Sequence, residues 1–318
     1  MSDTFKVMKL SFGATANALD GEAGEIIGAV MEVGSHKITH AVVLLGGGPA
    51  GVQVLVPVGL FTDTTTESAE ISVTREALLQ TMTKAGSAPY ISASARATKK
   101  GAVIGNVVHI SFAADTGAAN NIVIKSGNAL MVAPSSGIVS ISDNAKTIEF
   151  ADTDALFIPY LPDTDLQDTI YNALYNYPRL RIDLHSVQIR AIDGEVWLTG
   201  FVSSTLNRKI IEKLLTPIQG ISELHNDIVD DTDLSITIAR ALSQDSRTRG
   251  KMIGVYSNLG NVLLRGYAQD ESIAQVALQI AGGVSGSAKV VNQMVVGEQT
   301  YIPMLAPVTN HEDITPGE

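Results

Sequence analysis

Two pairs of arginines stand at equivalent places in a repeated segment of the chain. Arg179 and Arg181 come 68 residues before Arg247 and Arg249. An arginine pair can hold a phosphate or a carboxylate through forked hydrogen bonds, so these four residues are the candidate ligand site. The alternatives are a solvated turn, or a cation placed at the C-terminus of a helix.

Three histidines offer the nitrogen ligands that a transition metal requires. His36 and His40 lie four residues apart, which places them on one face of a strand, and His109 falls in an equivalent region farther along. A third ligand is not spaced beside the first pair, so surface or turn histidines are the preferred interpretation. We therefore predict neither a metal site nor a cofactor.

Other segments that could carry chemistry have plainer explanations. The glycine-rich segment 46–51 precedes a strand pattern, whereas a phosphate loop needs Gly-Lys-Ser/Thr and a helix, so we expect a hairpin loop. Aspartates clustered at 163–168 and 230–233 lack the spacing of a calcium loop and suit helix N-termini. The histidines stand apart from any nucleophile in sequence, and we predict that the protein is not an enzyme.

The arginines belong to a duplicated pattern of helices and strands. Residues 164–230 and 232–298 each follow the order α-β-β-α-β. Gly194-x-Val196-x-Leu198-x-Gly200 returns 66 residues later as Gly260-x-Val262-x-Leu264-x-Gly266. Asp193-Gly194 before the first motif is typical of a tight hairpin turn.

The first half of the chain carries a fainter repeat. Residues 1–84 and 91–160 show strand patterns joined by glycine-rich turns, with matching segments about 78 residues apart. Residues 85–90 contain Gly and Pro and form the expected joint between them. Residues 299–318, which contain three prolines, are expected to form a loose tail.

One face of each C-terminal sheet is expected to lack a cover of helices. Val196 and Leu198 should face the helices, so Trp197 and Thr199 should point to the other side. In the second copy the corresponding apolar surface contains Leu263, Val291 and Val295. An apolar face requires a partner, and we predict packing between modules or between subunits. A platform for a lipid or small ligand is the alternative.

The duplicated C-terminal pattern resembles BON domains, which are small bacterial modules. The resemblance rests on Gly194, Val196, Leu198, Gly200 and Asn226, and on Gly260, Val262, Leu264, Gly266 and Asn292. BON modules are associated with envelope stress proteins and with attachment to phospholipid or a small ligand. The resemblance therefore implies a stress-related binding module, with phospholipid as one candidate partner.

The first half is similar to a tandem PRC-barrel. Residues 20–28 resemble the opening hairpin of that family, residues 39–44, 56–58 and 71–73 stand where its later strands would be, and residues 100–105 approximate the same hairpin in the second copy. PRC-barrels occur in a photosynthetic reaction-centre subunit and in a ribosome-maturation factor. The resemblance implies docking to a protein complex without catalysis.

The composition limits the classes of function. A net charge of −11 disfavours a nucleic-acid partner, and the absence of cysteine excludes disulfides and thiolate zinc sites. The N-terminus lacks the pattern of a signal peptide and no apolar run reaches membrane-spanning length, so we expect a cytoplasmic protein, with a place at the membrane periphery as the alternative.

Together the patterns predict a β-rich α+β fold, with two small PRC-barrel-like β-domains followed by two α-β-β-α-β BON modules. Only 17% of the residues are charged, which favours surfaces that are hidden by self-association. The leading hypothesis is a non-catalytic scaffold that forms a homo-oligomer or filament. The alternatives are a peripheral adaptor for phospholipid or a small ligand, and a docking protein for one specific complex.

Overall fold

A computed structural model describes residues 7–32, 34–46, 51–86, 89–153 and 156–297. The expected tail at 299–318 and most of the glycine-rich loop, residues 47–50, lie outside the described residues. The chain divides into two units, Met1–Gly200 with Lys209–Ile228, and Phe201–Arg208 with Val229–Glu318. Within the described ranges, none of the helices combines the length and the apolar character that crossing a membrane requires.

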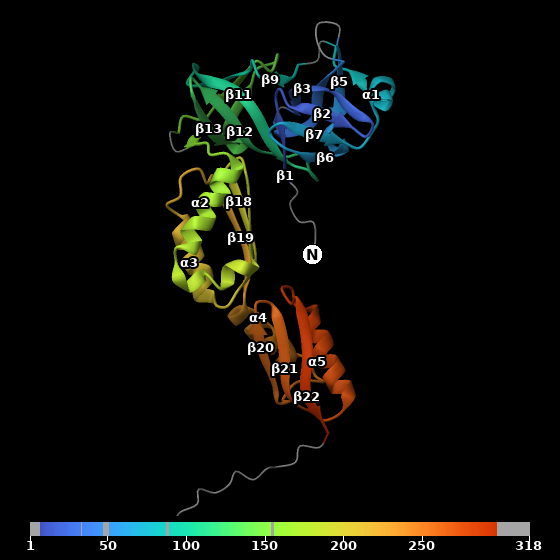
Figure 1. Cartoon of the computed structure of the whole chain (residues 1–318), viewed down its shortest axis with the longest axis vertical. Helices are drawn as coiled ribbons and strands as arrows, with labels where there is room; N and C mark the ends of the chain where they lie inside the picture. The colour runs from blue at the N-terminus through green and yellow to red at the C-terminus, as the bar shows by residue number, and fades with distance from the viewer. Residues whose placement is uncertain (1–6, 33, 47–50, 87–88, 154–155, 298–318) are drawn as a thin grey trace, which may run out of the picture. The chain divides into compact units, whose positions relative to one another are not determined.

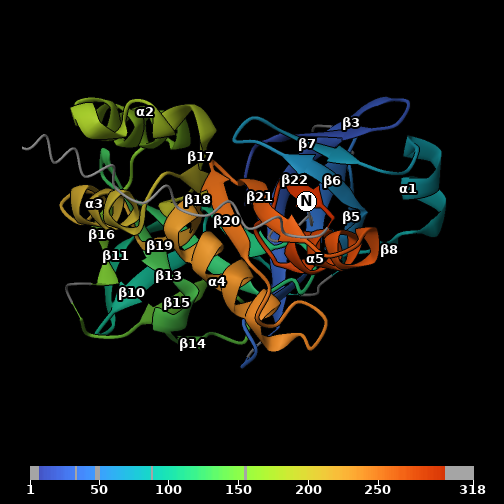
Figure 2. The same cartoon turned by 90° about the horizontal axis from the view of Figure 1, so that it is seen from below.

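The first β-domain, coloured blue to cyan in Figure 1, is a curled sheet. Its strand order is β6-β7-β2-β3-β4-β5-β8. A short helix, α1 (Arg75–Thr81), lies beside β5 (Figure 2) and begins after Thr74, whose side-chain oxygen accepts a hydrogen bond from the backbone N–H of Ala77. The strands are β2 (Thr15–Ala18), β3 (Gly21–Glu32), β4 (Lys37–Leu45), β5 (Val52–Pro57), β6 (Phe61–Thr64), β7 (Ser68–Ile71) and β8 (Thr83–Lys84).

The second β-domain repeats this topology in the order β14-β15-β10-β11-β12-β13-β16. Each domain contains one parallel pair at the same place, β2 with β7 and β10 with β15. The faint repeat in the sequence thus corresponds to two sheets of identical strand order. The strands are β10 (Arg96–Lys99), β11 (Ala102–Ala113), β12 (Ala119–Ser126), β13 (Ala129–Pro134), β14 (Ile138–Ile141), β15 (Thr147–Phe150) and β16 (Ile158–Pro159).

The two β-domains exchange their first strands. β1 (Val7–Ser11) begins the described chain but pairs antiparallel with β11 of the second domain, and β9 (Ile91–Ser92) pairs with β3 of the first. Apolar side chains of both domains consequently form one continuous core, which includes Leu10, Ile26 and Phe112. Because single domains of this size bury little surface, a shared core stabilises both.

The third domain has the predicted order α-β-β-α-β and a sheet with the order β17-β18-β19. Its first helix buries Leu166, Ile170 and Leu174 at helical spacing and contacts β17. Asp193 and Gly194 form the turn between β17 and β18 with φ angles of 49° and 86°, as a two-residue hairpin requires. The elements are α2 (Asp163–Tyr175), β17 (Val187–Ile192), β18 (Glu195–Val202), α3 (Thr205–Leu215) and β19 (Glu223–Asp230).

The fourth domain has the same order of elements and a sheet with the order β20-β21-β22. Its helices contact each other and the sheet (Figure 2), and they bury apolar residues that include Leu234, Ile238 and Ala277 against Leu264. β21 and β22 run parallel. The elements are α4 (Asp231–Gln244), β20 (Ile253–Asn258), β21 (Asn261–Ala268), α5 (Glu271–Gly283) and β22 (Lys289–Val296). The β-rich α+β fold predicted from the sequence is confirmed.

Candidate functional site

Arg181 and Arg249 occupy the same position in the third and fourth domains and make the same contact. The Nε of Arg181 donates to the carbonyl of Tyr175 over 3.1 Å, and the Nε of Arg249 donates to the carbonyl of Ser243 over 3.3 Å. These carbonyls end α2 and α4, where backbone oxygens lack partners within the helix and where a cation is favoured by the helix dipole. The contacts correspond to the helix-terminal alternative named from the sequence.

The other two arginines lie on exposed turns. Arg247 forms a bidentate ion pair with Asp245, with nitrogen-to-oxygen distances of 3.0 and 2.7 Å. Hydrogen bonds from Arg247 lower the pKa of Asp245 to about 2. Arg179 lies in the short turn Pro178–Leu180 and is exposed. At least three of the four guanidinium groups therefore contact the chain itself, and anion binding by them stays a prediction.

Trp197 points away from the helices as expected, yet its side chain is only 7% exposed. It packs in a buried cluster with Val7 of β1 and Ile192, and its ring stacks on that of His225 at a centroid distance of 5.3 Å. Arg190 donates a hydrogen bond of 3.3 Å to the carbonyl of Val7. The expected open face is thus corrected at Trp197, because the N-terminal strand of the same chain covers it. Thr199, on the same strand, is exposed.

The corresponding side of the fourth domain remains exposed. Leu263 is half-buried, whereas Val291 and Val295 are 37% and 59% exposed. The parallel register aligns Leu263 with Val291 and Val295 with Tyr267. Two tyrosines that the sequence analysis did not single out enlarge the surface, although alternation along β20 and β21 could have indicated them. This surface, called the fourth-domain face below, consists of Tyr256, Leu263, Tyr267, Val291 and Val295.

A buried ionic cluster joins the third domain to the β-domains. The ammonium group of Lys9 lies 2.5 Å from Asp163 and 3.1 Å from Asp193, and Lys9 and Asp193 are almost wholly buried. The Nε2 of His109 lies 3.1 Å from the same Asp193 carboxylate. Burial lowers the pKa of Lys9, but the two carboxylates outweigh burial and raise that pKa above its ordinary value. Lys9 therefore remains charged inside the contact.

Asn121 of β12 completes this contact. Its Nδ2 donates to the carbonyl of Asp193 over 3.1 Å and to the Oγ of Ser222 over 3.0 Å. Burial raises the pKa of Asp193, yet its interactions with His109 and Lys9 leave the pKa lowered. The sequence contains no local signal for this cluster, since Lys9 and Asp193 are 184 residues apart.

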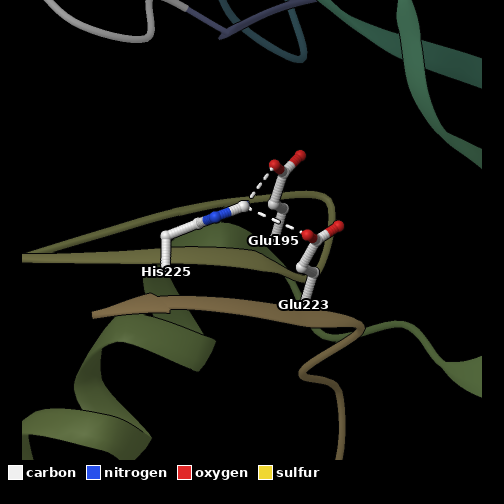
Figure 3. A group of neighbouring side chains, drawn as sticks. All are labelled: Glu195, Glu223 and His225. Atoms are coloured by element: carbon white, nitrogen blue, oxygen red, sulfur yellow. Dashed lines mark hydrogen bonds and ion pairs between the residues drawn. The ribbon is translucent and has the colours of Figure 1, made fainter. Parts of the chain in front are cut away.

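A second polar cluster lies beside the contact and consists of Glu195, Glu223 and His225. Glu195 begins β18, while Glu223 and His225 alternate along the neighbouring β19. Figure 3 shows the three side chains converging above the sheet. The Nε2 of His225 lies 2.8 Å from Glu195 and 3.7 Å from Glu223. Asn120 of β12 donates to the other carboxylate oxygen of Glu195.

Burial and a neighbouring carboxylate both disfavour the ionised form of Glu195 in this second cluster. Glu195 is 5% exposed, and desolvation raises the pKa of its carboxyl group, with a further increase from the charge of Glu223. Hydrogen bonds from Asn120 and His225 act in the opposite direction. The cluster thus gathers an imidazole nitrogen and two carboxylates, a donor set that can bind a metal ion.

The histidines weighed from the sequence are not part of that group. Among the residues described by the structure, the three-ligand group of His, Asp or Glu side chains is Glu195, Glu223 and His225. His36 lies in a turn with a φ of 51°, and His40 lies on β4. His109 belongs to the Lys9 cluster. No local sequence pattern indicates the role of His225, because its partner Glu195 lies 30 residues earlier on another strand.

Comparison with known proteins assigns the third and fourth domains. The family model of the BON domain matches residues 162–229 and 230–298. The match does not extend to the two β-domains, for which the PRC-barrel resemblance stays a prediction. No curated protein matches the chain.

Two solved structures of a protein from Chlamydia trachomatis are similar to parts of the chain. One is described as CdsD, the structural protein of the Type III secretion system, C-terminal domain, with 16% identity, a TM-score of 0.37, and coverage of 49% of this chain and 73% of that chain. The other is a further study of CdsD, with 16% identity, a TM-score of 0.37, and coverage of 48% and 68%. The third and fourth domains of this chain have the same α-β-β-α-β order. Together with the family match, this order identifies the segment 162–298 as two consecutive BON domains.

Proposed function

We propose that the protein is a non-catalytic scaffold that self-associates through the fourth-domain face. This proposal rests on a difference in exposure between the equivalent sheet faces of the third and fourth domains. In the third domain the sheet face at Trp197 is buried by Val7 of the same chain. In the fourth domain the matching face exposes Tyr256 and Val295 by 56% and 59%. Arg265 and its hydrogen-bond partner Gln293 lie between the apolar residues of this face. Exposed apolar side chains of this kind, with a polar pair among them, favour a protein partner.

A second copy of the chain offers a surface of matching chemistry. The third domain docks on Lys9, His109 and Asn121, and the first β-domain has counterparts to these positions. His40 pairs with Pro57 as Asn121 pairs with Pro134. Gly28 lies opposite Ser92 as His109 lies opposite Ser11. By the same register Tyr90 corresponds to Lys9.

The fourth domain and the first β-domain both lack charged residues that form the contact between the third domain and the second β-domain. Asp193, the anchor of the third domain, corresponds to Leu259 in the fourth. Lys9 and His109, its partners, correspond to Tyr90 and Gly28 in the first β-domain. The pairs of Asp193 with Lys9 and His109 thus have uncharged counterparts on both sides. Asp163, the second partner of Lys9, corresponds to Asp231, which accepts hydrogen bonds from the backbone of its own hairpin turn. The proposed contact is therefore head-to-tail, between the fourth-domain face of one copy and the surface around Gly28, His40 and Tyr90 in the first β-domain of the next. Heterologous contacts of this type generate rings or filaments.

Self-association is tested by placing two charges on the fourth-domain face. The double variant Val291→Lys with Val295→Lys introduces ammonium groups that must be desolvated in any contact. Val139→Lys is the matched control, because Val139 is 65% exposed on β14 and lies outside the proposed surfaces. Sedimentation velocity over a range of concentrations measures the mass of each protein.

The expected result is a wild-type mass that rises with concentration above the 33.5 kDa of one chain. The double variant should stay at the mass of one chain, and Val139→Lys should follow the wild type. A wild type that remains monomeric at every concentration would contradict self-association. An assembly unchanged by the double variant would move the contact to another surface.

A further inference from the structure

We infer that Glu195, Glu223 and His225 form a binding site for one divalent transition-metal ion of the zinc type. The inference is independent of self-association, because the three residues belong to the third domain and not to the fourth-domain face. Each residue offers one ligand atom, and these atoms lie within 4.8 Å of one another.

The spacing of the side chains fits a tetrahedral ion. Zinc binds nitrogen and oxygen at about 2.0 Å, which separates its ligands by roughly 3.3 Å. The distances from the Nε2 of His225 to the two carboxylates, 2.8 and 3.7 Å, lie on either side of that value. The exposed Glu223 side chain can rotate to shorten the longer distance, while the 2.8 Å pair of His225 and Glu195 must open slightly to admit the ion. Figure 3 shows the three side chains directed toward one another.

Two of the ligands are held in place by neighbouring groups. Asn120 donates to the Oε2 of Glu195 and leaves Oε1 directed at His225. The His225 ring stacks on Trp197 with an interplanar angle of 13°. Such outer contacts orient metal ligands and strengthen binding. Glu223 is 66% exposed and His225 is 34% exposed, so an ion and a water ligand can reach the site from solvent.

The donor set selects the class of ion. Calcium and magnesium prefer oxygen ligands alone, whereas an imidazole nitrogen with two carboxylates suits zinc and its neighbours in the first transition row. Two carboxylates close together in a chain of net charge −11 also favour a cation. A bound ion would relieve the repulsion that Glu223 imposes on the buried Glu195.

The site is specific to the third domain. The corresponding residues of the fourth domain are Asn261, Lys289 and Val291, which include a cation and an apolar side chain. The third domain combines the ligands with a contact to the second β-domain through Asn120. An ion bound here would connect β18 to β19 beside that contact and make the contact more rigid.

Zinc binding can be measured directly on the full-length protein without a histidine tag. After dialysis against a chelator, equilibrium dialysis with Zn²⁺ should give one bound ion per chain. His225→Ala should abolish this binding, and Glu223→Gln should weaken it at least about 10-fold. Glu22→Gln, which changes an exposed carboxylate on another domain, is the matched control and should bind like the wild type. Circular dichroism verifies the fold of each variant.

Trp197 provides a second readout at the site. It is the only tryptophan of the chain and stacks on a proposed ligand, so its fluorescence should change and saturate at one equivalent of Zn²⁺ in the wild type and in Glu22→Gln. The inference is overturned if the wild type takes up no zinc saturably. It is equally overturned if folded His225→Ala and Glu223→Gln bind zinc as the wild type does.

Discussion

At the scale of single residues, the two BON domains differ in chemistry at one hairpin turn. Asp193 and Leu259 both adopt a left-handed conformation, with φ angles of 49° and 47°. Asp193 is wholly buried between Lys9 and His109, whereas Leu259 is partly exposed. The sequence predicts the turn, because Asp-Gly is typical of it. It could not predict the ionic role, since the partners of Asp193 lie on distant strands.

Removing the charge of Asp193 should destabilise the third domain and its contact. Asn tolerates positive φ, so Asp193→Asn keeps the turn and removes only the anion. Lys9 then loses its buried counter-charge and keeps only the partly exposed Asp163, and the free energy of unfolding should fall by about 3 kcal/mol. Urea denaturation measures the loss. Leu259→Asn is the control at the equivalent turn and should cost little or nothing. Equal stability of wild type and Asp193→Asn would mean that the cluster does not stabilise the contact.

At the scale of elements, the repeated Gly-x-Val-x-Leu-x-Gly motif is explained by close backbone approach. A Cβ atom on Gly200 would lie 1.8 Å from the carbonyl oxygen of Ser186, and one on Gly266 would lie 1.9 Å from that of Met252. Both glycines also have positive φ. The sequence therefore predicted these strand pairs correctly, and the motif marks a place where only glycine fits.

Replacing either motif glycine by alanine should destabilise its own domain. The clash with the neighbouring strand and the positive φ together should lower the free energy of unfolding by about 2 kcal/mol or more. Gly282→Ala is the opposite control, because Gly282 lies in α5 with open space around its Cα, and alanine there should stabilise the helix by up to about 1 kcal/mol. Thermal unfolding followed by circular dichroism distinguishes the three variants. A stable Gly266→Ala protein would refute this explanation of the motif.

Sequence patterns could not reveal that β1 and β9 are exchanged between the two β-domains. β9 has two residues and β1 has five, lengths at which periodicity carries little information. Each strand also pairs with a partner about 60 or more residues away in sequence. Long-range pairing of short strands depends on tertiary packing rather than on local propensity.

At the scale of the whole molecule, the chain contains two β-domains and two BON domains, and the two BON domains differ in what their equivalent faces contact. One BON domain is attached to the β-domains through Asp193, and the other presents its equivalent face to solvent. The composition favoured hidden surface but could not say which surface, because Trp197 and Leu263 look equivalent in the sequence. The difference depends on Val7, which covers Trp197.

Anionic lipid vesicles test the adaptor alternative. With a net charge of −11, and with Arg247 paired to Asp245, we expect no more protein in the pellet with vesicles than without them. Replacement of Arg179, Arg181, Arg247 and Arg249 by alanine should leave pelleting unchanged. Pelleting that requires vesicles and is lost in the quadruple variant would favour the adaptor function instead.

The head-to-tail contact is tested most directly by mixing two variants that are each defective on one side. Val291→Lys with Val295→Lys removes the fourth-domain face, and Tyr90→Glu removes the proposed surface of the first β-domain. Each variant alone should sediment as a single chain of 33.5 kDa. A one-to-one mixture should form a complex of twice that mass and nothing larger, because each partner supplies one intact surface. A mixture that stays at the mass of a single chain would contradict the head-to-tail contact.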